Sequence, residues 1–264
     1  MTGRVLIIAG SDSGGGAGIQ ADIKTVTCLG GYAATAITAL TAQNTCGVFA
    51  VHEVPPDFVV RQMQLVLEDV GADCIKTGML ATTRIIEAVA DALERFAPQV
   101  PLVVDPVMVA KGGAPLLADE AAKTMVARLL PRAAVLTPNL PEAEALLGRA
   151  IPDVDAMEEA ARDLLAMGPQ AVLLKGGHLP GDDLVDILAD STGVRRFTGK
   201  RIAGTSTHGT GCTLASAIAT GLARGTTLDD AVARARAYVR RAIQTAPGLG
   251  KGHGPLNHGH TVHL

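Results

Sequence analysis

Short runs of hydrophobic residues alternate along the chain with segments whose apolar positions recur every three or four residues. The runs lie at residues 5–9, 34–40, 74–75, 102–107, 135–137 and 172–174. Continuous apolar runs of this length are typical of strands that are buried on both faces. Between them, Val59, Met63 and Val66 share one helical face, as do residues 85, 89, 93 and 96 and residues 157, 160, 164 and 167.

This alternation predicts an α/β fold, with a mostly parallel sheet between two layers of helices. Residues 184–204 contain shorter strand-like segments with turns, which we expect to add antiparallel strands at an edge. No Pro/Ser/Gly-rich linker or internal repeat divides the chain, so we expect a single domain over residues 1–264. Ligands of such sheets bind beyond the carboxyl ends of the strands.

Composition narrows the class of protein. A net charge of −3, no Trp and only two Tyr provide neither the basic field nor the stacking aromatics of a nucleic-acid-binding protein. No charged residue lies between Lys24 and Glu53, but glycines and polar residues interrupt this stretch, so we expect a buried interior and no membrane span. The four cysteines form no Cys-x-x-Cys pair, which indicates a reducing, cytoplasmic location.

A glycine-rich turn at residues 207–213 directly precedes a predicted helix marked by Leu214, Ile218 and Leu222. The backbone N–H groups in the first turn of a helix have no intrahelical acceptors and favour an anion, most often phosphate. The alternative is an ordinary glycine turn beside a buried Cys212.

Several other loops carry candidate chemistry. Asp105 lies at the end of one predicted strand and Lys175 follows another, which places a carboxylate and a phosphate-binding cation at the mouth of the sheet. Asn139 and Glu142 start a predicted helix, either as oxygen ligands facing magnesium and its waters or as a capping box. Residues 16–21 match a loose dinucleotide fingerprint, but no acidic residue follows where a ribose would need one, and no P-loop motif occurs.

Seven segments in fixed order together resemble the hydroxymethylpyrimidine/phosphomethylpyrimidine kinases of thiamine biosynthesis. The segments are residues 14–22, 41–45, 76–80, 105–109, 137–142, 175–178 and 207–212. The resemblance implies a ribokinase-like three-layer α/β/α sandwich, a homodimer, and Mg-ATP (ATP with Mg2+) as phosphoryl donor. It implies phosphorylation of 4-amino-5-hydroxymethyl-2-methylpyrimidine and then of its monophosphate.

The resemblance also implies roles for individual residues. Gln43 would accept from the 4-amino group of the pyrimidine and donate to the adjacent ring nitrogen, a match that a carboxylate would not provide. The other implied positions are Asp22, Met79 and Val107 for substrate, Asn139, Glu142, Lys175 and Thr207 for the nucleotide, Asp105 and Glu142 for magnesium, and Gly209, Thr210, Gly211 and Cys212 for the anion hole and catalysis.

Cys212 occupies the place where most ribokinase-like sugar kinases carry an aspartate that takes the hydroxyl proton. A helix N-terminus lowers the pKa of a thiol from about 8.5, whereas a nearby ATP γ-phosphate raises it. The sequence leaves open whether Cys212 acts as a base. We expect a thiol to tolerate the second, already anionic acceptor better than a carboxylate.

The C-terminal histidines at 253, 258, 260 and 263 are expected to belong to a flexible, solvated tail and not to a metal site. Arg236 lies near a position where the resembled family often carries a phosphate-binding lysine, and His208 could shape the glycine turn. The alternative activities are pyridoxine or pyridoxal kinase and a non-catalytic ligand-binding relative.

Overall fold

A central sheet runs through the computed structural model, which describes residues 2–108, 119–204 and 206–262. In this part of the chain the sheet has nine strands in the order β3-β2-β1-β4-β5-β6-β7-β8-β9. The strands are β1 (Arg4–Asp12), β2 (Tyr32–Asn44), β3 (Gly47–Glu53), β4 (Cys74–Thr77), β5 (Leu102–Val104), β6 (Val135–Leu136), β7 (Ala171–Leu174), β8 (Asp183–Asp190) and β9 (Gly193–Lys200). The strands from β2 to β7 are parallel, and β3, β8 and β9 are antiparallel.

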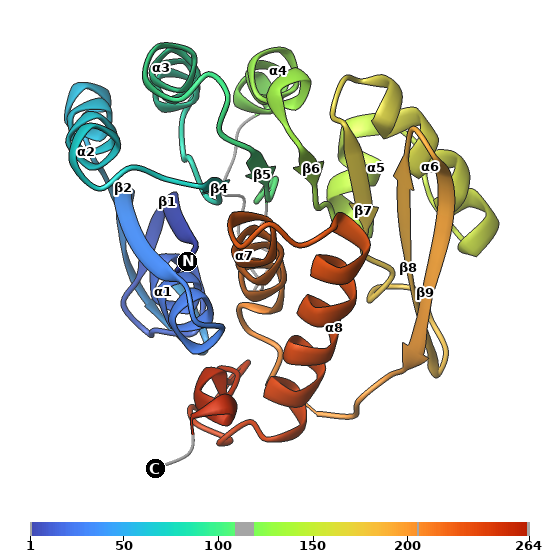
Figure 1. Cartoon of the computed structure of the whole chain (residues 1–264). Coiled ribbons are helices and arrows are strands. Elements are labelled where there is room, and N and C mark those ends of the chain that lie inside the picture. The colour runs from blue at the N-terminus through green and yellow to red at the C-terminus, as the bar shows by residue number, and fades with distance from the viewer. Residues whose placement is uncertain (1, 109–118, 205, 263–264) are drawn as a thin grey trace.

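Helices cover both faces of this sheet, as Figure 1 shows. One layer contains α2 (Pro56–Asp69), α3 (Thr83–Phe96), α4 (Asp119–Arg128), α5 (Leu140–Leu147) and α6 (Val154–Ala166), and the other contains α1 (Gly18–Cys28), α7 (Thr210–Ala223) and α8 (Leu228–Gln244). Short 3-10 helices lie at Leu130–Arg132 and His258–Thr261. The three-layer α/β/α sandwich with antiparallel edge strands is therefore confirmed.

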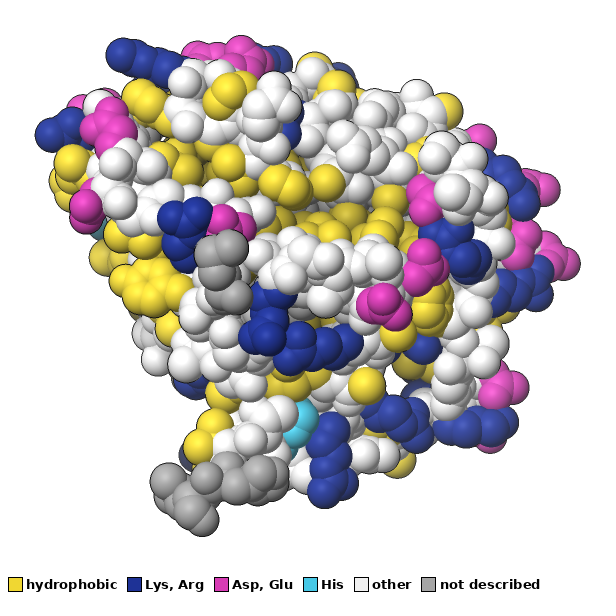
Figure 2. Space-filling view, in the orientation of Figure 1, with side chains coloured by type: hydrophobic (Ala, Val, Ile, Leu, Met, Phe, Trp, Pro, Cys, Tyr) yellow, Lys and Arg dark blue, Asp and Glu magenta, His cyan; other side chains and the backbone are white. Residues whose placement is uncertain are grey.

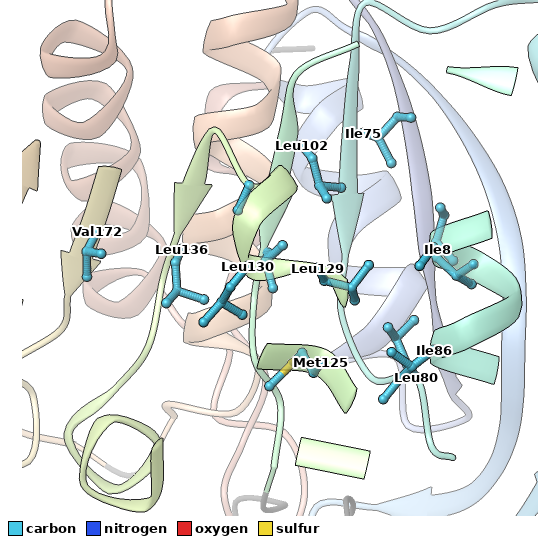
Figure 3. Close-up of a cluster of buried hydrophobic side chains, with 14 of the residues drawn as sticks. Ile8, Ile75, Leu80, Ile86, Leu102, Met125, Leu129, Leu130, Leu136 and Val172 are labelled. Carbon is cyan, nitrogen blue, oxygen red and sulfur yellow. The ribbon is translucent and has the colours of Figure 1, made fainter. Parts of the chain in front are cut away.

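Alternating side chains of the buried strands divide the core in two. Ile8, Ile75 and Leu102 point toward the larger helical layer and pack there with Ile86 and Leu129, as Figure 3 shows. Val5, Ile7 and Val103 point the other way, toward α1, α7 and α8. The predicted helical stripes lie in the core, because their central residues, such as Met63, Val89 and Leu164, are fully buried.

The uncharged stretch between residues 24 and 53 differs from the prediction. It contains two strands, and β3 is an edge strand whose residues from Phe49 onward are exposed. Lack of charge therefore does not mean burial here. The predicted strand at 102–107 is also shorter, because Pro106 has no N–H to continue the ladder and the chain turns through a bond from the Val107 N–H to the Asp105 carbonyl.

The prediction of a flexible, solvated C-terminal tail is wrong for His258. Its side chain is 4% exposed and its Nε2 lies 2.9 Å from the Thr213 hydroxyl, while the Tyr238 hydroxyl donates to its carbonyl at 2.6 Å. Burial of an aromatic ring against α7 and α8 holds this segment in place. His253 is exposed, and His263 lies outside the described residues.

Candidate active site

A cavity of about 1150 Å³ opens where the parallel strands end. Its wall includes residues at or shortly after the ends of five strands: Asp12 of β1, Gly78 after β4, Asp105 after β5, Asn139 three residues after β6, and Lys175 after β7. The carboxyl ends of parallel strands meet at one edge of a sheet, which is where such folds bind ligands. The seven segments singled out in the sequence all contribute to this wall, although Val109, which ends one of them, lies outside the described residues.

The glycine turn forms the middle of this wall. Gly209 is the N-cap of α7 with φ of +81°, and a Cβ there would lie 1.8 Å from the carbonyl oxygen of Gly16, so only glycine fits. No side chain caps the helix. The first intrahelical bond runs from the Thr213 N–H to the Gly209 carbonyl, which leaves the N–H groups of Gly211 and Cys212 without intrahelical acceptors at the cavity.

Cys212 reaches the cavity from the first turn of α7. Burial raises the pKa of its thiol to about 12, and the carboxylates of Asp22 and Asp105 add to this effect, while Lys76 opposes it. The side chain is therefore a protonated thiol at neutral pH. A helix N-terminus lowers the pKa of a thiol, but here burial outweighs that effect.

Lys175 lies near the carboxylates of Asp105 and Glu142, on the other side of the turn. Its Nζ donates to Asp105 Oδ1 at 3.2 Å, and a Cβ on Gly211 would lie 3.3 Å from this nitrogen. Burial works against the charge of Lys175, but Asp105 and Glu142 outweigh it and raise the pKa of the lysine. A permanent cation therefore lies directly beside the open N–H groups of the glycine turn.

Asn139 and Glu142 form the capping box of α5. The Asn139 side chain accepts from the Glu142 N–H at 2.9 Å, and Glu142 Oε2 accepts from the Asn139 N–H at 2.7 Å. The capping alternative is thus confirmed. Burial, helped by repulsion from Asp105 and opposed by Lys175, raises the pKa of Glu142 to about 7. Both residues also line the cavity, so capping does not remove them from the site.

Gln43, Met79 and Val107, three of the positions that the resemblance implied for substrate, line the cavity together. Ser13 fixes the backbone of Gln43 because its Oγ donates to the Gln43 carbonyl at 2.7 Å and accepts from the Gln43 N–H at 2.8 Å. The Gln43 amide lies between Thr41 Oγ1 and His208 Nε2, each at 3.2 Å.

Asp22 does not line the cavity, so the prediction of a direct substrate contact is not supported by its position. It is fully buried and accepts from Lys76 Nζ at 2.9 and 3.0 Å and from the Ser216 hydroxyl at 2.7 Å. Lys76 does line the cavity. Burial opposes its charge, but Asp22 outweighs burial and raises the pKa of Lys76. Asp22 thus holds a buried cation beneath the site.

Asp12 and Lys76 were not among the predicted site residues, and His208 was expected only to shape the turn. His208 Nε2 lies 2.9 Å from Asp12 Oδ2, and all three side chains line the cavity. Asp12 is the last residue of β1. Because ligands gather at the ends of the strands in such sheets, this position could have identified Asp12 as a site residue. Lys76 lies within β4, where a charged residue in a fully buried strand is itself unusual.

The far end of the cavity is lined by β9 and α8. Phe197 and Thr198 belong to β9, and Arg236 and Arg240 to α8. Arg236 does not lie free, because its Nε donates to Asp186 at 2.7 Å and its guanidinium lies over the Phe197 ring. Lys and Arg side chains gather at the lower ends of α8 and β9 in Figure 2. Thr207 and Thr210, which belong to the glycine turn, also line the wall.

Two classes of feature are absent from the described ranges. Within residues 2–108, 119–204 and 206–262, no group of three or more His, Cys, Asp or Glu side chains could hold a metal ion by itself. No helix in those ranges is apolar over a length that would cross a bilayer.

Comparison with known proteins finds relatives that match almost the whole chain. The chain is 55% identical over 256 residues to the thiamine biosynthesis bifunctional protein ThiED of Geobacter sulfurreducens, covering 97% of this chain but only 52%, about half, of that longer protein. It is 49% identical over 260 residues to the hydroxymethylpyrimidine/phosphomethylpyrimidine kinase of Escherichia coli, covering 97% of each.

A solved structure supports the fold. The pyridoxal kinase of Staphylococcus aureus, in complex with AMP-PCP and pyridoxal, superimposes with a TM-score of 0.90 at 36% identity, covering 98% of this chain and 94% of that one. The family model described as phosphomethylpyrimidine kinase matches residues 12–257, from the carboxylate that ends β1 to the C-terminal segment packed on α8. The chain therefore belongs to the phosphomethylpyrimidine kinase family of α/β kinases.

Proposed function

We propose that this kinase transfers the γ-phosphoryl group of ATP to the hydroxymethyl group of 4-amino-5-hydroxymethyl-2-methylpyrimidine, and then to the monophosphate so formed. The proposal rests on three features that share one cavity. They are the Gln43 amide, which can recognise a ring edge, the uncapped helix N-terminus at Gly211, and the charged Lys175. The first feature fits an aminopyrimidine edge, and the other two fit a phosphoryl group in transfer.

Charge stabilisation is the main contribution of the protein to this reaction. The transition state of phosphoryl transfer is loose in most analyses, so positioning and charge carry most of the barrier. The N–H groups of Gly211 and Cys212 and the ammonium of Lys175 lie around one point of the cavity. They are fixed before substrate binds, so no reorganisation is needed during transfer.

Cys212 meets the acceptor hydroxyl as a neutral thiol in this proposal. A pKa of about 12 leaves little thiolate at neutral pH, and the approach of an anionic phosphate lowers that fraction further. The proton of the acceptor is therefore lost late in the transfer, and the thiol serves mainly to pack against the acceptor without adding negative charge.

Magnesium fits the carboxylates beside Lys175. Burial raises the pKa of Glu142 to about 7, and repulsion from Asp105 contributes to that rise. A dication bound between the two carboxylates would relieve this repulsion. Mg2+ commonly takes one or two carboxylates and completes its shell with phosphate oxygens and water. Asp105 and Glu142 would hold it, with Asn139 nearby, and the ion would neutralise charge on the ATP phosphates.

The nucleotide base is assigned to the far end of the cavity. Apolar side chains from the segment after β9 and from α8, namely Ile202, Ala237 and Ile243, suit a purine ring, and Arg240 supplies positive charge beside them. The AMP-PCP complex of the S. aureus pyridoxal kinase supports ATP as the donor. Thr207 begins the glycine turn and lines the cavity, which fits a phosphate-binding residue.

A coupled ADP-release assay tests the activity. The purified chain is given Mg-ATP with the pyrimidine alcohol, its monophosphate and pyridoxine in parallel. We expect turnover with both pyrimidines and a loss of about 100-fold or more in Lys175→Met. Lys123→Met, on α4, is the matched control and should retain wild-type turnover. Absence of ADP release with either pyrimidine would refute the proposal.

Pyridoxine kinase activity is the second candidate. It is favoured by one observation, the TM-score of 0.90 to a kinase solved with pyridoxal. Turnover of pyridoxine in the same assay, above that of both pyrimidines, would make it the principal activity. Absence of Mg-dependent ATP consumption with every acceptor would instead support a non-catalytic relative.

We also propose a homodimer formed through β3. Within the described part of the chain this strand is paired on one side only, and Leu40, Phe49 and Val51 on the β2–β3 hairpin are 46%, 71% and 44% exposed. An unpaired edge that exposes large apolar side chains is typical of an interface. Phe49→Lys should shift sedimentation from dimer to monomer, whereas Leu65→Lys on α2 should not. A monomeric wild type would refute this proposal.

A cytoplasmic location is proposed from cysteine chemistry. All four cysteines are unpaired, and Cys46 is exposed. Free exposed thiols persist where the surroundings are reducing. Fractionation of cells that express the untagged chain would test this location.

A further inference from the structure

Asp12 is a buried carboxylate with every oxygen engaged. Its Oδ1 accepts from the Gly14 N–H at 2.8 Å, and its Oδ2 accepts from Gly16 N–H at 3.1 Å and Ala17 N–H at 2.8 Å. Burial opposes its ionisation, but His208 and these backbone N–H groups outweigh burial and lower the pKa of Asp12. Asp12 is therefore an ionised carboxylate, which can only accept hydrogen bonds.

His208 is held against this carboxylate in one position. Its Nε2 lies 2.9 Å from Asp12 Oδ2, so this nitrogen must carry the hydrogen. A Cβ on Gly16 would lie 2.5 Å from His208 Cδ2, which shows how closely the ring packs on the glycine loop. The ring is 8% exposed. Both the hydrogen bond and the packing fix the donor end of the imidazole.

Gln43 lies in contact with that same ring nitrogen. In the structure its amide nitrogen is 3.2 Å from His208 Nε2 and its oxygen is 3.2 Å from Thr41 Oγ1. Two N–H donors would then face each other. The Thr41 hydroxyl, meanwhile, donates its single hydrogen to the Ser11 carbonyl at 2.9 Å and has none left for Gln43.

A half-turn of the amide is possible because its oxygen and nitrogen ends have nearly the same shape. Its nitrogen then donates to Thr41 Oγ1, and its oxygen shares the single Nε2 hydrogen of His208 with Asp12 Oδ2 in a three-centre bond, which removes both conflicts. We infer that Asp12, acting through His208, locks the Gln43 amide with its oxygen toward His208 and its nitrogen toward Thr41, and thereby determines which ring edge the enzyme accepts. His208 is then a positioning residue. It sets the order of donor and acceptor and does not touch the reacting atoms.

The locked amide presents one free lone pair on the His208 side and one free N–H on the Thr41 side. This inference rests on the proposed function, in which Gln43 reads the pyrimidine. A 4-aminopyrimidine offers a donor and an adjacent ring acceptor, which match this order. The 4-oxo analogue, with a ring N–H beside a carbonyl, requires the opposite order, and the fixed N–H of His208 opposes the rotation that would provide it.

The test compares the 4-amino substrate with its 4-oxo analogue in wild type, His208→Phe and His208→Gln. We expect wild type to prefer the 4-amino compound by about 100-fold or more in kcat/KM. His208→Phe removes the donor, frees the amide to rotate, and should lower this ratio about tenfold or more. His208→Gln places an amide N–H where Nε2 lies and should restore the ratio.

The outcomes separate the inference from the proposed function. Wild type that phosphorylates neither pyrimidine refutes the function. Active wild type with an unchanged ratio in a folded His208→Phe variant refutes the lock and leaves the function intact. If His208 had a merely structural role, its substitution would lower kcat/KM equally for both substrates.

A measurement without any substitution provides a second test. 15N NMR of histidine-labelled wild-type protein, assigned by the signal missing from His208→Gln, reports which ring nitrogen of His208 is protonated. A hydrogen on Nε2 is required, and an unprotonated Nε2 overturns the inference even if His208→Phe does not fold.

Discussion

Mild acid should weaken this fold through a single buried histidine. His258 is 4% exposed, its Nε2 lies 2.9 Å from the Thr213 hydroxyl, and the Tyr238 hydroxyl donates to its carbonyl. Burial lowers the pKa of His258 from 6.5 to about 4. The folded protein therefore keeps this ring neutral over a pH range in which the unfolded chain protonates it.

The size and sign of the effect follow from these two pKa values. Above about pH 6.5 the ring is neutral in both states, and its full contribution to stability is present. Between 6.5 and about 4 only the unfolded chain takes up the proton, so stability falls as pH falls. The whole change corresponds to about 3 kcal/mol, of which about 2 kcal/mol is lost between pH 7 and pH 5.

Urea unfolding at pH 7, 6 and 5 measures the loss. Wild type is compared with His258→Gln, which cannot titrate, and with His253→Gln as control, because His253 is exposed in the same segment. Between pH 7 and pH 5 we expect the free energy of unfolding to fall in both proteins. The fall in His258→Gln should be smaller than that in wild type by about 2 kcal/mol. Equal pH dependence in wild type and His258→Gln would refute the reasoning.

Three further substitutions test the site. Cys212→Asp should reduce phosphorylation of the monophosphate more than that of the alcohol, because it adds a charge beside an anionic acceptor; equal losses in the ADP-release assay would contradict this. Gly209→Ala, whose Cβ would collide with the Gly16 carbonyl, should lower kcat/KM by about 100-fold or more in protein that retains its circular dichroism. Lys76→Met leaves Asp22 buried without its cation and should cost about 3–5 kcal/mol in urea unfolding, with the added Asp22→Asn change recovering part of the loss.

The layers of the fold were predictable because burial on two faces leaves a local pattern. Runs such as residues 5–9 contain almost no polar side chain, and the helical stripes at Met63 and Val89 repeat with the helix period. The edge strand β3 was not predictable in the same way. Its apolar residues resemble buried ones locally, and only the order of strands reveals that they are exposed.

The site was predictable where position along a strand decides it. Asp105 and Lys175 follow strands β5 and β7, so the topology alone brings them to the same edge of the sheet. The hydrogen bond between Asp12 and His208 joins residues 196 positions apart, and no local pattern carries that information. Asn139 and Glu142 illustrate the remaining difficulty, since a capping box and a cation site use the same residue types at the same spacing.

The charges around Cys212 explain why a thiol can stand where related kinases use a carboxylate. Asp22, Asp105 and Glu142 already lie in or beneath this part of the site, balanced by the two lysines at 76 and 175. A further carboxylate would repel both the incoming phosphate and an acceptor that already bears one. A buried neutral thiol adds no such repulsion, so Lys175 and the open end of α7 remain available to the transferred group. We therefore propose that the cysteine favours the second phosphorylation by being uncharged, whether or not it ever accepts the proton.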